Sequence, residues 1–566
     1  MAFEIDIKMS GYQGVVEGAL REVQEKHIIQ RIWEGDYTVW KECPDEITNR
    51  LGWLQSAEQM KGVLPEIEDF LDGLQNKGYT DVLLLGMGGS SLAPEVYRKV
   101  FGVKPGYLNV TVLDSTDPGA VLSFTHQLKP ETTLFIVSTK SGGTVETLSF
   151  FQYFYSWMGH KVGVEHTGEH FIAITDPGTF LVKIANTFRF RRVFLNNPNL
   201  GGRYSALSCF GLVPAVLMGI DVPLLLERVD LMAKACGPDI PPPGNPAVVL
   251  GTLMGELAKN WRDKLTVLLS PSIISFGDWL EQLIAESTGK EGTGILPVVG
   301  EPVMSPSSYE KDRFFVSISL DQDETWPEKS MESLFLAGHP MVRMRMEDVY
   351  DLGAHFFLWE LATALAGYRL GINPFDQPNV ESAKKIAQRM VKEYQEKGIL
   401  PEPVSPSHFS QGMTVYGNHK TENSQAALLN FLSRCNPGDY VSVQAYIQPT
   451  PETDDLLYAL RMAITRRYQV ATTVGYGPRF LHSTGQLHKG DAGRGHFIQI
   501  TSDSVRDVPI PDQAGGNESS MTFGVLKSAQ ALGDFQALED QKRHLIRFHL
   551  GHEVTVGLDR LKRTWQ

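Results

Sequence analysis

The stretch FIVSTKSGGTVET, residues 135–147, is the most informative segment of this chain. Its apolar start, together with Leu134, has the pattern of a buried strand, and a helical pattern follows over residues 146–157. Hydroxyl side chains, one lysine and two glycines lie between them. A helix start favours an anion, because its free N–H groups and its dipole both present positive charge. The stretch therefore predicts a phosphate-binding turn between a strand and a helix; the alternative is a serine-rich turn that only caps the helix.

A second segment has a similar composition. Residues 82–85 have the pattern of a buried strand, GMGGSS follows at residues 86–91, and Pro94 suits a first helical turn. The glycines would let the backbone approach a ligand closely. The spacing matches neither GxGxxG nor GxxxxGK[ST], so neither a dinucleotide fold nor a nucleotide P-loop is indicated. Two such turns after successive strands fit one ligand at the carboxyl ends of a parallel sheet.

Strand and helix patterns alternate along most of the chain, which predicts an α/β fold with parallel, doubly wound sheets. The predicted strands of a first unit are residues 82–85, 110–113, 134–137, 171–174 and 192–195. In a second unit they are residues 265–269, 314–319 and 341–346. A third region shows strand patterns at 440–447 and 497–500 and an amphipathic helix at 454–468.

Proline-rich segments at residues 241–244 and 400–407 indicate boundaries between these units. We expect two doubly wound domains, a smaller C-terminal α/β region and helical ends. The predicted division is an N-terminal helical segment 1–74, a first domain 75–240, a second domain 245–400, a C-terminal α/β region 401–520 and a helical tail 521–566.

Composition narrows the classes of function. The chain has 566 residues, 42% of them hydrophobic and 21% charged, which is ordinary for a globular protein. A formal net charge of −14 argues against nucleic acid or an anionic membrane as the main partner. The four cysteines form no CxxC pair, so we expect neither a zinc site nor a disulfide framework. No signal-peptide or membrane-spanning pattern is seen, so a cytoplasmic location is expected.

Two charged side chains fall on predicted apolar helix faces. Glu286 lies in DWLEQLIAESTGK at a helical spacing from Trp279 and Leu283, which makes it a candidate base; the alternative is a pair with Lys290 at i+4. Lys384, in NPFDQPNVESAKK, falls on the same face as Val380, whereas Lys385 points away. A partly buried ammonium needs an anionic partner, which a substrate oxygen could supply, unless the side chain simply extends to solvent.

Arg203 follows two glycines after a predicted strand. From there its guanidinium, which is always charged, could stabilise an oxyanion that develops during a reaction. The alternative is a purely structural arginine at the start of a helix.

Five motifs in this order, GMGGSS, STKSGGTVET, GGRYSALS, ESTGK and NPFDQPNVESAKK, resemble the glucose-6-phosphate isomerase family, which is built from two sugar-isomerase (SIS) domains. The similarity covers about residues 30 to 400. The N-terminal segment and the last 160 or so residues resemble the isomerase half of bacterial transaldolase and glucose-6-phosphate isomerase fusions. The transaldolase half has no counterpart in this sequence.

The resemblance implies roles for individual residues. Arg203 would stabilise an enediolate, Glu286 would be the base, and Lys384 would lie near the sugar ring. The residues that would bind the sugar phosphate are Gly89, Ser90, Thr139, Lys140, Ser141, Gly142, Gly143 and Thr144. The family needs no metal and no organic cofactor, and it is commonly dimeric, so a homodimer is expected here.

The catalytic histidine departs from the family pattern. It usually begins a helix about twenty residues after the glutamate, where this chain has Ser307, Ser308 and Tyr309. An HSxGQ pattern occurs instead at His482, in the segment LHSTGQLHKG. We expect that His482 opens the sugar ring; the alternatives are His488, His355 or no histidine.

The expected reaction interconverts D-glucose 6-phosphate and D-fructose 6-phosphate through a cis-enediolate, a step of glycolysis and gluconeogenesis. A broader enzyme that also accepts mannose 6-phosphate is one alternative. The other is a sensor that binds sugar phosphates without catalysis, which the missing histidine would favour. Retention of Glu286, Arg203 and Lys384 argues against the sensor, because a sensor needs no base.

Overall fold

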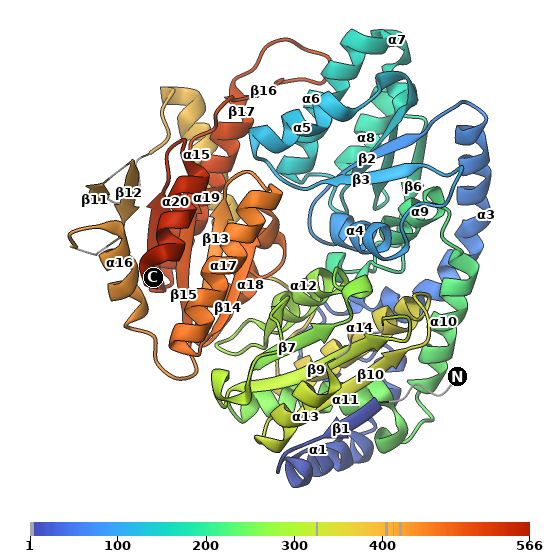
Figure 1. The fold of residues 1–566 in the computed structure, drawn as a ribbon. Helices are drawn as coiled ribbons and strands as arrows, with labels where there is room; N and C mark the ends of the chain where they lie inside the picture. Colours follow the sequence, from blue (N-terminus) through green and yellow to red (C-terminus); the bar gives the residue numbers. More distant parts are fainter. Residues whose placement is uncertain (1–4, 324–326, 402–405, 411, 418–420, 566) are drawn as a thin grey trace.

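The computed structural model describes residues 5–323, 327–401, 406–410, 412–417 and 421–565. Three parallel or mixed sheets organise the molecule, with helices between and around them (Figure 1). This confirms the predicted α/β class with parallel sheets. The sheets follow one another along the sequence, and the third sheet, in orange and red, lies beside the first two (Figure 1).

The first sheet has the strand order β3-β2-β4-β5-β6, and all of its neighbouring strands are parallel. Both faces of its central strands are buried, so the side chains of Leu83 and Leu84 enter different cores. Such burial explains why the strands are continuous apolar runs. Its strands are β2 Asp81–Gly86, β3 Asn109–Leu113, β4 Thr133–Ser138, β5 Phe171–Thr175 and β6 Arg192–Leu195, and its helices are α4 Gly89–Phe101, α5 Pro118–Gln127, α6 Val145–Val162, α7 Val164–Thr167, α8 Phe180–Thr187, α9 Cys209–Leu217 and α10 Val222–Ala235.

The second sheet has the order β1-β10-β9-β7-β8. Its strands are β7 Lys264–Leu269, β8 Leu296–Val299, β9 Arg313–Leu320 and β10 Met341–Met346, and its helices are α11 Pro246–Lys259, α12 Phe276–Thr288, α13 Glu328–Leu336, α14 Asp351–Leu370 and α15 Val380–Lys397. These four strands are parallel to their neighbours, whereas the edge strand β1 Ile5–Lys8 is antiparallel to β10.

Strand β1 corrects the expectation that residues 1–74 are helical. Four residues are too few to show a clear alternation, and the partner strand that pairs with them lies more than 330 residues away in the chain. The described residues from 9 onward in this segment contain the helices α1 Gln13–Glu25, α2 Ile28–Trp33 and α3 Ser56–Gln75.

The third sheet has the order β11-β12-β18-β15-β13-β14. Its strands are β11 Pro406–Ser410, β12 Met413–Tyr416, β13 Tyr440–Tyr446, β14 Ala471–Tyr476, β15 Gly495–Thr501 and β18 His544–His549, and its helices are α16 Ser424–Leu432, α17 Pro451–Tyr468, α18 Gly485–Gly490, α19 Phe523–Asp540 and α20 Val554–Lys562. A separate pair of strands, β16 Pro509–Ile510 and β17 Met521–Thr522, lies between β15 and α19.

The C-terminal tail is mostly helical, as expected, but it also contains strand β18. It pairs in parallel with β15, so the tail completes the third sheet. Its sequence, HLIRFH, contains the buried Ile546 and Phe548 between polar residues. That alternation was a strand signal, and the helical patterns on both sides concealed it.

One hydrophobic core joins the first two sheets. It includes Val82 and Leu84 of β2, Leu265 and Val267 of β7, and much of α9, α10, α11 and α14. The third sheet has a separate core. The third sheet packs against the others partly through its helices, since α19 packs on α15. Its strands also take part, because a small cluster joins Val298 of β8 to Tyr440 of β13 and Phe497 of β15.

Helices α11 and α14 pack closely because α11 has glycine at the contact. A Cβ at Gly251 would overlap the carbonyl of Ala362 and would lie 2.7 Å from the Cβ of Leu365. Nearly all of α14 is buried, so this helix has little space in which to move away from an added side chain on α11.

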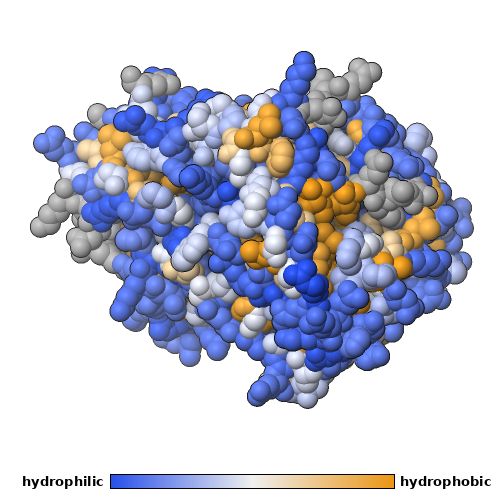
Figure 2. Space-filling view, turned by 90° about the horizontal axis from the view of Figure 1, so that it is seen from below, coloured by the Kyte–Doolittle hydropathy of each residue, from blue (hydrophilic) through white to orange (hydrophobic). Residues whose placement is uncertain are grey.

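The space-filling view in Figure 2 shows one face of the molecule as mostly hydrophilic, with hydrophobic residues gathered in separate patches. In the described part of the chain, none of the helices is both long enough and apolar enough to span a membrane.

Gly251→Ala is expected to lower the free energy of unfolding by about 1–3 kcal/mol, because overpacking forces the backbones of α11 and α14 apart. The matched control is Gly62→Ala on α3, where a Cβ meets no atom within 4 Å. There the same change should stabilise by up to about 1 kcal/mol, through the better helix propensity of alanine. Thermal unfolding of the two variants checks this; equal melting temperatures would contradict it.

Candidate active site

The two predicted turns lie side by side at the carboxyl ends of β2 and β4. These strands are neighbours, with Gly86 opposite Ser138. The Ser138 hydroxyl donates to the carbonyl of Ser90 at 3.2 Å, which joins the two turns directly. Their side-by-side position is what the sequence predicted for one shared ligand.

The glycines of the first turn have a different role from the one we expected. Helix α4 begins at Gly89, so the second half of GMGGSS is helical and Pro94 lies in the second turn, not in the first turn as expected. A Cβ at Gly89 would overlap the carbonyl of Gly202, and one at Gly88 would lie 3.1 Å from the Cβ of His482. Gly88 also has φ +55°, a conformation that favours glycine. The close approach is therefore to other backbone segments of the protein, including the one that carries His482.

The second turn leads into α6, whose first residue follows Thr144. The Thr139 and Thr144 hydroxyls are 2.8 Å apart, which closes the turn, and the Thr144 side chain caps none of the helix N–H groups. Those N–H groups and the helix dipole remain available to an anion. Ser141 and Gly143 are exposed beside them, and Gly142 has φ +70°.

Lys140 of this turn is already paired. Its Nζ lies 2.6 Å from Oδ2 of Asp176, which follows β5. The lysine is about one quarter exposed, so a phosphate on the turn would compete with Asp176 for it.

Glu286 lies near the end of α12 with 13% of its side chain exposed. Its Oε1 is 3.3 Å from Nη1 of Arg203, and its Oε2 accepts a hydrogen bond of 3.0 Å from Gln282, one helical turn earlier. Lys290 does not pair with it: the Lys290 Nζ donates to Oδ1 of Asp376 at 2.8 Å. Burial and the nearby Arg203 guanidinium lower the pKa of Lys290 to about 8, although Asp376 opposes this shift.

Arg203 is almost fully buried, in the short 3₁₀ helix Gly202–Tyr204 after β6. Its Nε donates to the Ser287 hydroxyl at 2.7 Å, and its Nη2 donates to the carbonyl of Pro374 at 2.7 Å. The Nη1 group, which faces Glu286, also donates to Gln377 at 3.0 Å. A buried guanidinium is tolerated when its N–H groups all find acceptors. The acceptors of Arg203 lie on α12 and in the segment NPFDQ, residues 373–377, so this side chain connects both to the first sheet.

His482 reaches this region from the third sheet. It ends the 3₁₀ helix Arg479–His482 after β14, and its Nε2 lies 2.9 Å from Oε1 of Glu146 in the first turn of α6. The Gln282 Nε2 that holds Glu286 also donates to the backbone carbonyl of His482 at 2.7 Å. One amide group therefore links the candidate base to the candidate histidine.

The other two candidate histidines lie in different surroundings. His355 is 2% exposed on α14, and burial lowers its pKa to about 4. His488 is 1% exposed between Ser442 and Gln444, and burial lowers its pKa well below the ordinary value. Both imidazoles are neutral and enclosed, so the geometry favours His482.

Glu146 is a residue whose role we did not predict. Burial alone would raise its pKa, but the charge and hydrogen bond of His482 outweigh burial and leave the pKa below its ordinary value. Gln530 of α19 donates to the same Oε1 at 2.7 Å and accepts from the Thr116 hydroxyl at 2.9 Å. Glu146 could have been predicted as a site residue, because it lies in the first turn of a helix that follows the predicted phosphate-binding turn. Nothing in the sequence around Gln530 indicates its role.

Lys384 is half-buried, and its anionic partner in the structure is Glu381. Its side chain is 37% exposed, and its Nζ lies 3.2 Å from Oε1 of Glu381 on the same helix. Helix α15 begins only at Val380, so Lys384 sits in its second turn and at the margin of the buried stripe. It is still close enough to Glu146 to lower the pKa of that carboxyl. Lys385 is exposed, as expected.

The described residues contain no group of three or more histidine, cysteine or acidic side chains arranged to hold a metal ion.

Comparison with known proteins finds a family model that matches part of the chain. Residues 48–294 match the family model described as phosphoglucose isomerase. The matched segment contains both turns, Arg203 and Glu286, whereas Lys384 and His482 lie beyond it.

Curated relatives include glucose-6-phosphate isomerases from Thermosynechococcus vestitus, 30% identical over 357 residues, and from Methanocaldococcus jannaschii, 26% identical over 352 residues. These alignments cover 55% and 56% of this chain and 66% and 85% of the relatives. The chain thus spans just under two thirds of the Thermosynechococcus protein. These relatives are isomerases, and the resemblance of this chain to transaldolase fusions stays a prediction.

Solved structures share the fold. A glucose-6-phosphate isomerase from Chlamydia trachomatis has a TM-score of 0.58 at 17% identity and covers 70% of this chain and 89% of its own. A hypothetical protein from Thermus thermophilus has a TM-score of 0.59 at 22% identity, and the match covers 68% of this chain and 99% of that protein. At these identities the likeness concerns the fold alone.

The pKa of Glu146 gives a test of the His482 contact. In His482→Phe, burial is unopposed by that contact, so the pKa of Glu146 should rise above its ordinary value. The folded variant then binds a proton more tightly than the unfolded chain, and its stability falls as pH rises through the new pKa. His482→Phe/Glu146→Gln should therefore melt higher than His482→Phe at pH 7, and the gap should close toward pH 5. A gap that does not change with pH would contradict this.

Proposed function

We propose that the protein interconverts D-glucose 6-phosphate and D-fructose 6-phosphate. The observation that carries this is the convergence of two pairs, Arg203 with Glu286 and His482 with Glu146, around the Gln282 amide. One pair supplies a base beside a fixed cation, and the other supplies a proton carrier beside a carboxylate. An isomerisation by proton transfer needs both.

The phosphate of the substrate binds at the start of α6, on the turn from Thr139 to Thr144, with Ser90 beside it. Lys140 turns from Asp176 toward the phosphate. Fixing this end of the sugar orients C1 and C2 at the other end and lowers the entropic part of the barrier.

His482 opens the ring of the cyclic sugar by moving a proton between the ring oxygen and O1. Glu146 lies in hydrogen-bond contact with the imidazole, which fixes the orientation of the ring. Lys384 assists from the margin of the site.

Glu286 then removes the proton from C2 of the open chain and returns it to C1, while the proton of the C2 hydroxyl moves to O1, so that C2 becomes the carbonyl carbon. The electrons that the C2–H bond releases form the C1–C2 double bond of the cis-enediolate, and negative charge develops on the sugar oxygen. The Arg203 Nη1 group, 3.3 Å from Glu286, stabilises that charge without rearrangement, because its other contacts already hold it in place.

The sensor alternative depended on a missing histidine. His482, paired with Glu146, supports catalysis instead, because a non-catalytic binding site has no need of a base and a proton carrier in contact with one shared amide.

Glu286→Gln should lower kcat by about 10² to 10⁴ with little change in KM, because the amide keeps the shape but cannot accept the proton. The matched control is Glu281→Gln on the same helix. Burial and the nearby Asp278 carboxylate raise the pKa of Glu281 to about 8, so its neutral form already resembles glutamine. Both variants are measured in a coupled assay with fructose 6-phosphate and by the loss of deuterium from C2 of labelled glucose 6-phosphate; Glu281→Gln should keep the wild-type rate. Unchanged label exchange in Glu286→Gln would refute the proposal.

Gln530→Met should lower kcat about tenfold and leave KM within twofold, because one hydrogen bond to the ionised Glu146 is lost while the phosphate turn is untouched. Gln536→Met, on the same helix but paired with Asp540, is the control and should keep the wild-type rate. A tenfold rise in KM with unchanged kcat would mean that Gln530 acts on binding rather than on the histidine.

A further inference from the structure

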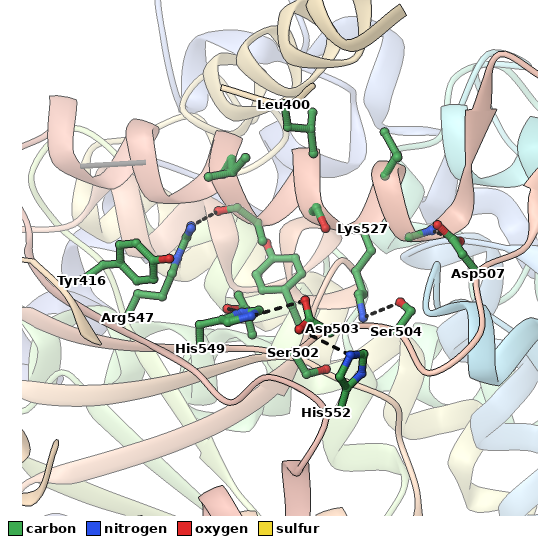
Figure 3. Close-up of a pocket in the computed structure, with 17 residues that line it drawn as sticks. Leu400, Tyr416, Ser502, Asp503, Ser504, Asp507, Lys527, Arg547, His549 and His552 are labelled. Atoms are coloured by element: carbon green, nitrogen blue, oxygen red, sulfur yellow. Dashed lines mark hydrogen bonds and ion pairs between the residues drawn. The ribbon is translucent and has the colours of Figure 1, made fainter. Parts of the chain in front are cut away.

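A second cavity lies at the carboxyl ends of the third sheet, away from the site described above. In this sheet β14 lies on one side of β13 and β15 on the other, so the strand order reverses between β13 and β15. Doubly wound sheets bind ligands in the crevice outside such a reversal. The segment that follows β15, from Ser502 to Ser504, lines a cavity of about 550 Å³ there (Figure 3). That volume suits a small molecule.

Arg547 of β18 supplies a buried positive charge to the cavity. It is 4% exposed, and burial lowers its pKa to about 10, so it stays charged at neutral pH. Its Nη2 donates to the carbonyl of Ala531 at 3.0 Å and its Nε to Gln499. Among the described residues, none accepts a hydrogen bond from its Nη1 group and none is a carboxylate paired with it.

Tyr446 supplies a second unused donor. It ends β13, lines the cavity and is fully buried, yet its hydroxyl has no hydrogen-bond partner among the described residues. Burial raises the pKa of Tyr446 well above its ordinary value, so the hydroxyl keeps its proton. A buried donor without a partner is unfavourable, and a ligand oxygen would satisfy it.

Groups suited to a polyhydroxylated ligand complete the wall. The Asp503 carboxylate lies 3.4 Å from His549 Nε2 and 3.9 Å from His552 Nε2, so it can accept hydrogen bonds from sugar-like hydroxyls (Figure 3). The Lys527 Nζ, paired with Asp117 at 2.8 Å, also faces Ser504 at 3.5 Å. Arg547 and Lys527 supply positive charge to the cavity, and Asp503 with the two histidines supplies further polar groups (Figure 3). This combination fits a ligand with a charged end and hydroxyl groups.

We propose that this cavity is a second small-molecule site, which binds a phosphorylated polyol. Its phosphate contacts Arg547 and Tyr446, and its hydroxyls contact Asp503 and the two histidines. The proposal does not depend on catalysis at the first site, because none of the cavity residues belongs to that site.

Helix α19 connects the two sites. Lys527 lines the cavity, and Gln530, about one turn later, holds Glu146 beside His482. Their partners on the first domain, Asp117 and Thr116, are adjacent residues. A ligand that draws Lys527 from Asp117 therefore changes the support of the Glu146–His482 pair.

The test uses full-length protein with Ser141→Asp, which places a carboxylate in the exposed phosphate turn and repels phosphate from the first site. Sorbitol 6-phosphate, which has no carbonyl to isomerise, is titrated calorimetrically. One equivalent per chain should bind. Adding Ser528→Tyr, which fills the cavity from α19, or Arg547→Met should weaken binding at least tenfold. Adding Gln536→Tyr, which lies on the same helix but outside the cavity, should leave the binding affinity unchanged.

Thermal melting of each variant shows that it is folded. Absence of binding to Ser141→Asp, or binding that survives both cavity variants, would overturn the proposal. Inorganic phosphate should bind more weakly than sorbitol 6-phosphate; equal affinity would refute recognition of the polyol.

The NMR signals of the His482 ring nitrogens should shift when sorbitol 6-phosphate binds. Binding without such a shift would refute the connection between the two sites through α19. Failure of the isomerase proposal would appear in turnover and label exchange, which this calorimetry does not measure.

Discussion

The buried guanidinium of Arg203 is the constraint on which the candidate site depends. A charge with 2% exposure is tolerable in a protein interior only when its donors are satisfied, and the acceptors here come from α12 and from the segment before α15. Those two segments and the first sheet must therefore keep one relative position. Glu286 is held within that arrangement, which places a carboxylate beside a cation at a slightly open surface. The shared core of the first two sheets makes the arrangement rigid.

The third sheet contributes the part of the site that the first two lack. His482 enters between the sheets and contacts Glu146, while Gly88 leaves room for its backbone. Gln530 fixes the same carboxylate from another element of that unit. A carboxylate that accepts hydrogen bonds from an imidazole and an amide has its position and its charge determined by residues far from it in the sequence. The C-terminal region is thus a structural component of the candidate site and also bears a cavity of its own.

Several elements could be predicted because their signals are local. The strands of the first sheet were found from continuous apolar runs, and the turns at 86–91 and 139–144 from glycine and hydroxyl residues after a strand. The missed elements had weak or masked local signals. Strand β1 is four residues long, and β18 lies between two long helices. The early start of α4 was missed because Gly89 is a poor helix former, yet only glycine fits against the carbonyl of Gly202.

The sequence by itself determined the α/β class, the adjacency of the two turns, and the buried helix face that carries Glu286, since helical and strand periodicities are properties of neighbouring residues. The tertiary structure alone decided that His482 meets Glu146, that Lys290 pairs with Asp376 and not with Glu286, and that Lys384 remains partly exposed. Each of these depends on how separate elements pack, and hydrogen-bond partners far apart in the chain leave no trace in the local pattern. Packing is therefore what converts the predicted residues into a site.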